Sequence, residues 1–192
     1  MIRKFVLIFV FIIMLFQFPR IPFADYASAL DTDGWKVIES KYFTILCHPE
    51  INMAKFNSRV QVRFYDVEWG RYLPKNKSVD EQVANKFDRI FRKVEKILDM
   101  YPRKIHPTVK IFKTQAQLDK EYAKIFGSND GIERISYYVH KLTTIYTTEA
   151  MVSEGVLAHE MGHAVADHYF VIFPPYKVGE LLSQFVELHL ED

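Results

Sequence analysis

The chain has 192 residues, of which 49% are hydrophobic and 15% aromatic, and its formal charge at pH 7 is +1. This length and apolar content predict one domain with a sizeable core that needs no crosslinks. The nearly balanced charge argues against a nucleic-acid partner, which usually requires a clearly basic face. The single cysteine, Cys47, cannot form an internal disulfide, and we expect it to be a small buried apolar side chain.

The first 29 residues are organised like a secretory signal peptide. Arg3 and Lys4 form a positive start, Phe5–Phe18 is apolar except for one glutamine, and residues 27–29 (Ala-Ser-Ala) form a small-residue cleavage pattern. As a helix, the apolar run would rise about 21 Å, less than the ~30 Å hydrocarbon core of a bilayer. We therefore predict an exported protein, periplasmic or secreted, that is cleaved after Ala29 and folds over residues 30–192. The alternative is an uncleaved signal anchor, and only then do we expect a membrane partner.

Strand patterns come next along the chain. Tyr42–Leu46 is the strand-like core of the segment Trp35–Cys47. Arg59–Tyr65 alternates apolar and polar residues, which predicts a half-buried strand or a hairpin arm. Leu73–Lys77 is polar and holds a proline, so it is expected to be a loop.

The middle of the chain carries clear helix signals. Ser78 and Glu81 form a capping box that begins a helix, and Pro102 marks its end. Thr108–Phe112 has the composition of a short strand. A second helix is predicted over Thr114–Gly127, with the same capping pattern at its start and a glycine at its end.

The last third predicts two strands and two helices. The strands are Ile135–His140 and Thr143–Thr147, and the helices are Met151–His168 and Val178–Leu190. The short connection between the two strands requires them to be antiparallel. Alternating strands and helices then predict an α+β fold in which a small mixed sheet with an antiparallel member packs on helices.

The third predicted helix contains the motif that carries chemistry. It reads His159-Glu160-Met161-Gly162-His163, and residues four apart on a helix lie on one face. Both imidazoles can therefore reach one Zn²⁺ ion, which accepts neutral imidazole nitrogens. Glu160 lies next to the first ligand and can take a proton from zinc-bound water. The surrounding apolar residues predict that this helix is buried, so the three polar groups need partners.

Zinc needs a third protein ligand, and the sequence leaves two sources for it. A metzincin would have a histidine where this chain has Tyr169, so that alternative fails. The other source is a glutamate on the following helix, beyond the break at Pro174 and Pro175. Glu180 and Glu187 both lie on that helix.

Two stretches, VLAHEMGH at residues 156–163 and GELLSQFVE at residues 179–187, resemble the corresponding motifs of gluzincins, especially the compact MA-like peptidases. The resemblance covers residues 135–190 best and the strand–helix–strand before them more weakly. It implies a zincin-like domain that holds one Zn²⁺ through His159, His163 and Glu180, with Glu187 as the second choice for the third ligand. It also implies that Thr143–Thr147 lies inside the sheet and that Ile135–His140 is its antiparallel edge, where an extended peptide can pair.

The predicted function is zinc-dependent hydrolysis of peptide bonds in a peptide or protein substrate, with Glu160 as the general base. A further donor should stabilise the oxyanion, and Tyr176, His168 and His140 are candidates, although His168 is expected to point away from the metal. Asp167 lies four residues after His163 and is a candidate to orient it. The alternative function is a catalytically silent, zinc-binding exported adaptor or folding module, because little chain follows Glu180 to wall a cleft.

Overall fold

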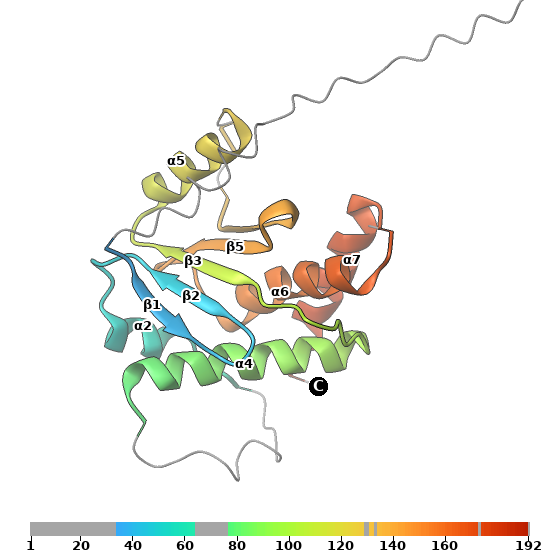
Figure 1. The fold of residues 1–192 in the computed structure, drawn as a ribbon, viewed down its shortest axis with the longest axis horizontal. Coiled ribbons are helices and arrows are strands. Elements are labelled where there is room, and N and C mark those ends of the chain that lie inside the picture. The colour runs from blue at the N-terminus through green and yellow to red at the C-terminus, as the bar shows by residue number, and fades with distance from the viewer. Residues whose placement is uncertain (1–33, 64–76, 129–130, 133, 173, 192) are drawn as a thin grey trace, which may run out of the picture.

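The computed structural model describes residues 34–63, 77–128, 131–132, 134–172 and 174–191. The predicted signal peptide and most of the predicted loop Leu73–Lys77 lie outside these residues. Within them are five strands and five α-helices (Figure 1). The strands are β1 (Lys36–Glu39), β2 (Thr44–Cys47), β3 (Thr108–Phe112), β4 (Ser136–Val139) and β5 (Thr144–Thr148). The helices are α2 (Met53–Arg59), α4 (Val79–Leu98), α5 (Gln115–Phe126), α6 (Glu154–Tyr169) and α7 (Tyr176–Leu188).

The strands form one mixed sheet in the order β1-β2-β3-β5-β4. The three inner strands are parallel, and β1 and β4 pair antiparallel with their neighbours at the two edges. The register places Ser136 opposite Thr147 in the β4–β5 pair. The α+β class, the mixed sheet and its antiparallel edge are therefore confirmed, with β4 at the edge and β5 inside. The tight β4–β5 connection is a single 3₁₀ turn over His140–Leu142.

Two strand predictions in the N-terminal third are corrected. Arg59 ends α2, and residues 60–63 form no regular structure, so the predicted strand Arg59–Tyr65 is wrong for its described part. The alternating pattern misled because Val60 is buried and Val62 packs partly buried against the main core, although these residues form no strand. The segment Trp35–Cys47 is two antiparallel strands, because Ser40 and Asp88 hold a turn between them.

The helices begin and end where local chemistry places their caps. The Ser78 hydroxyl accepts a hydrogen bond from the Glu81 N–H, and the Glu81 carboxylate accepts one from the Ser78 N–H, which confirms the predicted capping box of α4. Thr114 and Gln117 do the same for α5, which ends at Gly127 with a φ of 82°. Ser153 caps α6.

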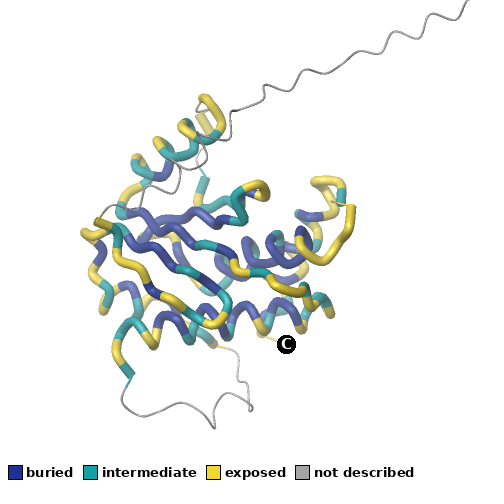
Figure 2. Tube along the Cα trace, viewed as in Figure 1, coloured by how far each residue is buried: buried dark blue, intermediate teal, exposed yellow. Residues whose placement is uncertain are grey.

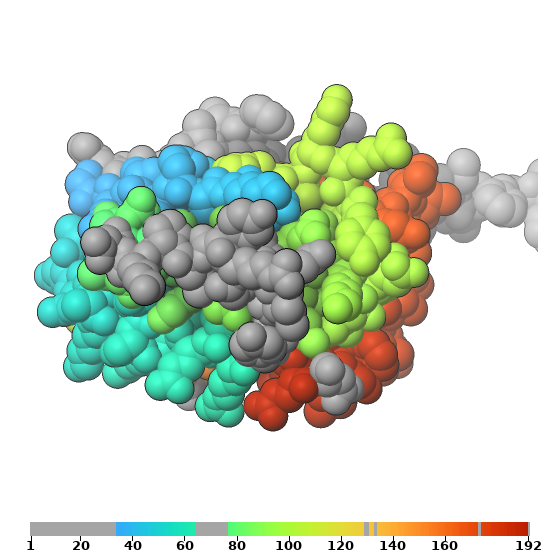
Figure 3. Space-filling view, turned by 90° about the horizontal axis from the view of Figure 1, so that it is seen from below, coloured from blue at the N-terminus to red at the C-terminus, as the bar shows by residue number. Residues whose placement is uncertain are grey.

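Strand alternation divides the core between the two faces of the sheet. On β3, Val109 and Ile111 point into the main core with α2, α4 and α6, whereas Phe112 belongs to a smaller core with Leu118 of α5. Among the described helices, α5 thus covers one face of the sheet, and α4 and α6 cover the other. Buried segments follow the strands and the inner sides of α4 and α6 (Figure 2). Figure 3 views the molecule from the side of α4. Among the coloured residues, α2, α4 and the C-terminal residues form much of the surface seen there.

Cys47 lies in the main core, as predicted, with no exposed surface. Burial raises the pKa of its thiol to about 12. No helix in the described part of the chain combines the length and apolar character needed to cross a bilayer.

Candidate metal centre

The candidate site lies between α6 and α7, which pack unusually closely. A β-carbon at Gly162 would lie 3.1 Å from the Ser183 Cα, and one at Gly179 would lie 3.5 Å from the His163 Nδ1. Gly162 therefore lets the two helices approach closely, whereas the contact at Gly179 would be an ordinary one. The short, proline-containing connection after α6 turns the chain back and brings Glu180 against the His159–His163 face.

His159, His163 and Glu180 converge on one point. The Nε2 atom of His163 lies 3.4 Å from Glu180 Oε1, and the Nε2 atom of His159 lies 3.7 Å from Glu180 Oε2. Ligands at ~2.1 Å from a tetrahedral zinc ion are separated from one another by about 3.4 Å. The two measured separations are close to that value, and ligand atoms from all three residues lie within 4.8 Å of one another. The three residues therefore form a group that could hold a metal ion.

The carboxylate of Glu187 lies near the other ring nitrogen of His159, a candidate ligand. Its Oε2 lies 3.4 Å from His159 Nδ1, while Glu180 faces Nε2 of the same ring. The alternative assignment of Glu187 as third ligand is thus disfavoured by its position. A carboxylate behind a ligating histidine fixes the tautomer and the orientation of the ring. This is the position that Glu187 occupies.

Glu160 is almost completely buried, with 6% of its surface exposed. Burial raises the pKa of its carboxyl to about 8, and the negative charge of Glu180 adds to this rise. Hydrogen bonds with the Ser136 hydroxyl and with the backbone of Tyr138 partly oppose it. The general-base candidate therefore lies against the edge strand β4 and next to the charge of Glu180.

Burial lowers the pKa of His163, and the neighbouring His159 lowers it further, although Glu180 acts in the opposite direction. The neutral imidazole is the form that binds a metal. The two rings lie nearly perpendicular, with centroids 5.1 Å apart. The local environment of His163 therefore favours its ligating form.

Tyr176 is the oxyanion candidate that lies at the site. It is the first residue of α7, and its side chain is largely exposed. A hydrogen bond with Glu180 raises the pKa of its hydroxyl, and the charges of Glu180 and Glu160 contribute. The hydroxyl therefore remains a donor at neutral pH, close to both carboxylates.

The other three candidates form a separate cluster. Asp167 and His168 lie on the last turn of α6, and His140 lies in the 3₁₀ turn after β4. Asp167 accepts a 2.7 Å hydrogen bond from the Tyr138 hydroxyl and forms an ion pair with His140. Asp167 Oδ2, the oxygen that accepts from Tyr138, lies 3.6 Å from His168 Nδ1, which also lies 3.0 Å from the Ala164 carbonyl. Asp167 thus contacts β4 and its neighbours. The sequence had suggested instead that Asp167 would orient His163. The contacts of Asp167 tie the end of α6 to the edge strand.

The remaining histidines lie elsewhere in the fold. His48 contacts Gln117, His106 contacts Thr44, and His189 contacts the Phe185 carbonyl. The sequence reasoning missed the contact of Ser136 with Glu160, because no local pattern reveals which strand residue faces a helix across the sheet edge. Gly162 had a signal, since a glycine inside a buried helix usually marks a close packing contact.

Comparison with protein-family models, with curated proteins and with solved structures finds no match to this chain. A functional assignment therefore rests on the chemistry and geometry of the residues themselves.

Proposed function

We propose that this protein is a zinc metallopeptidase with a zincin-like domain, in which His159, His163 and Glu180 hold one Zn²⁺. The observation that carries the proposal is the convergence of both Nε2 atoms on the Glu180 carboxylate, at 3.4 and 3.7 Å. A partly buried pair of imidazoles facing a carboxylate costs desolvation energy, and a bound cation would offset that cost.

The position of the sheet edge supports hydrolysis of an extended peptide. Among the described strands, β4 pairs with β5 alone, and its other edge could form main-chain hydrogen bonds to a substrate. The backbone of Tyr138, in the middle of β4, contacts Glu160. A peptide paired along this edge would therefore run close to the general-base candidate and to the metal ligands.

The residues divide the chemistry among themselves. Zinc in this site would polarise the scissile carbonyl and make a water molecule more acidic. Glu160 would take a proton from that water and pass it to the leaving amine. Tyr176 donates a hydrogen bond to the developing oxyanion. Glu187 keeps the His159 ring oriented.

Export through the N-terminal segment belongs to the same proposal, with cleavage after Ala29. N-terminal sequencing of the protein recovered from the extracytoplasmic fraction tests it. A mature chain that begins at residue 30 is the expected result, and an intact N-terminus would favour the anchored form.

The decisive experiment measures zinc content and peptide hydrolysis in wild type and in Glu160→Gln. We expect one zinc per chain in both proteins and a loss of hydrolysis by a factor of about 10²–10⁴ in the variant. Glu191→Gln, which changes an exposed glutamate of similar type, should retain both properties. Full activity in Glu160→Gln would refute the assigned base. Zinc without hydrolysis in the wild type would instead favour a silent zinc-binding adaptor or folding module.

A further inference from the structure

A second concave site lies on the other face of the sheet, beneath α5. It is a pocket of about 390 Å³ lined by residues of β3 and α5, by Trp35 just before β1 and by His48 just after β2. This volume is at the small end of the range for ligand pockets. The candidate zinc ligands lie on α6 and α7, which are on the opposite side of the sheet.

The aromatic wall of the pocket is fixed by ring packing. The Trp35 ring meets Phe112 edge to face at 5.1 Å and meets His48 at 5.4 Å. The Lys110 ammonium lies 5.1 Å from the centre of the Trp35 ring and 5.6 Å from that of Phe112. A flat apolar group can therefore pack here against a rigid surface.

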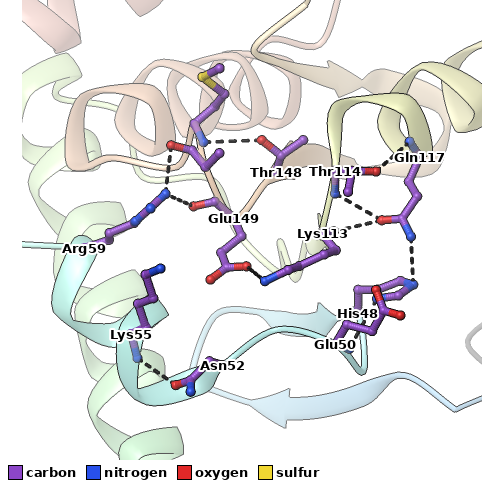
Figure 4. A network of polar contacts seen from close by, with 12 residues as sticks. His48, Glu50, Asn52, Lys55, Arg59, Lys113, Thr114, Gln117, Thr148 and Glu149 are labelled. Carbon is purple, nitrogen blue, oxygen red and sulfur yellow. Dashed lines mark hydrogen bonds and ion pairs between the residues drawn. The ribbon is translucent and has the colours of Figure 1, made fainter.

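On the α5 side of the pocket, the side-chain amide of Gln117 is held in place by polar contacts, as Figure 4 shows. Its side-chain oxygen accepts hydrogen bonds from the backbone N–H groups of Lys113 and Thr114, at 3.0 and 3.1 Å. Its nitrogen lies 3.2 Å from His48 Nε2. Because the amide is held at both ends, this side of the pocket needs no rearrangement to receive a ligand.

A buried ion pair forms part of the lining. The Lys110 ammonium lies 2.8 Å from Glu121 Oε1, with only 3% and 11% of the two side chains exposed. Such a pair is seldom better for stability than apolar residues of the same size. Its place in a pocket lining is therefore better explained by recognition than by folding.

The charge around the pocket is positive. The lining holds three lysines and one glutamate, a formal surplus of two positive charges when His48 is neutral. Lys120 and Lys124 are exposed and lie one helical turn apart on α5, so they share a face. A concave site with low-dielectric walls concentrates such a field on an anion. Glu121 opposes a doubly charged group, which favours a single carboxylate.

We propose that this pocket binds a small aromatic carboxylic acid, whose ring packs against Trp35 and Phe112 and whose carboxylate lies near Lys120. The site is independent of the proposed zinc centre, because it uses no residue of α6 or α7.

Calorimetric titration of the full-length protein with 3-phenylpropionate tests this proposal, with the neutral 3-phenylpropanamide as the matched ligand. We expect the acid to bind with a dissociation constant of about a millimolar or lower and the amide to bind at least about tenfold more weakly. Lys120→Glu and Trp35→Ala should each weaken binding of the acid by about tenfold or more. Lys55→Glu on α2 makes the same charge change far from the pocket and should bind like wild type.

Three results would overturn the proposal. They are no saturable binding of the acid by the wild type, equal affinity for acid and amide, and unchanged affinity in Lys120→Glu. Binding of the acid should survive His159→Ala and treatment with EDTA. Loss of zinc or of hydrolysis alone would therefore count against the peptidase proposal and leave this one standing.

Discussion

Two glutamates lie buried on opposite faces of the same sheet, and their surroundings differ. Glu121, on α5, has the Lys110 ammonium 2.8 Å from its carboxylate. Glu160, on α6, has hydrogen bonds from β4 and the like charge of Glu180 nearby, and its pKa rises to about 8. One acid is neutralised by a side chain of the protein, whereas the other lies beside a cluster of metal-ligand type.

On the α5 side, the carboxylate of Glu121 has a positive partner within the protein. On the α6–α7 side, the carboxylate of Glu160 has a like charge nearby. A buried carboxylate without a cation is stabilised in its protonated form. The second carboxylate, Glu180, faces two imidazoles of which at least His163 favours its neutral form. An added positive ion would therefore stabilise the α6–α7 side most and the α5 side least.

The largest expected effect is on the pH dependence of stability in the metal-free protein. The folded-state pKa of Glu160 is raised from 4.5 to about 8, so its contribution to stability is complete below pH 4.5 and is lost as pH rises to about 8. Over that window, we expect the free energy of unfolding to fall by an amount on the order of 5 kcal/mol from this group. Urea unfolding in EDTA, at several pH values, measures it.

Glu160→Gln is the control for this titration, because an amide does not change its charge. The variant should show a much flatter dependence between these pH values. Equal slopes in the two proteins would mean that Glu160 is ionised in the folded state. The contrast between the two glutamates would then be lost.

A second prediction concerns the ion pair on the α5 side. Glu121→Leu alone should lower the free energy of unfolding by about 3–5 kcal/mol, because it leaves the Lys110 charge buried. The double variant Lys110→Met with Glu121→Leu should be close to wild type, since apolar residues of similar size replace a buried pair at little cost. Thermal and urea unfolding of the three proteins compares them. A double variant as unstable as the single one would show that the pair itself stabilises the fold.

A third prediction separates ligand from supporting residue on the α7 helix. Glu187→Gln should weaken zinc binding by roughly 10- to 100-fold, because the carboxylate behind His159 is lost while all three ligands remain. Glu180→Ala should weaken it further, because a ligand is removed. Competition with a chelating dye measures both. The reverse order of effects would reassign the third ligand to Glu187.

The smallest effect is expected from the close contact between α6 and α7. Gly162→Ala places a β-carbon 3.1 Å from the Ser183 Cα and should cost about 1 kcal/mol, once overpacking is set against better helix propensity. Gly155→Ala is the matched change on the same helix, because its nearest contact would be an ordinary 3.5 Å. It should leave the melting temperature unchanged or raise it slightly. Equal melting temperatures in the two variants would mean that the helices can separate without cost.

The sequence predicted most of the fold because the relevant signals are local. Capping boxes at Ser78 and Thr114 placed the starts of α4 and α5, and the strands β3, β4 and β5 followed from short apolar runs. The strand prediction failed for residues 59–63, because side chains that alternate in burial after a helix look like strand alternation. The end of α7 was placed two residues too late, since Leu190, beyond the helix, is an apolar residue buried in the main core.

The candidate site was partly predictable for the same reason. His159 and His163 share a helix face by spacing alone, and Glu180 followed from the resemblance to gluzincins. The support of Glu187 for His159 and the contact of Ser136 with Glu160 depend on how helices and strands pack, which spacing cannot reveal. The α5 pocket draws its residues from three distant segments. Its one local signal was Lys110, a charged residue inside a buried strand.

The burial of Cys47 gives the protein an internal reporter of its own opening. A thiolate is the species that reacts with disulfide reagents, and this thiol is both inaccessible and protonated in the native state. Labelling must therefore wait for the main core to open, so its rate follows the population of opened molecules. Because the chain has no other cysteine, each molecule labelled marks one opening event.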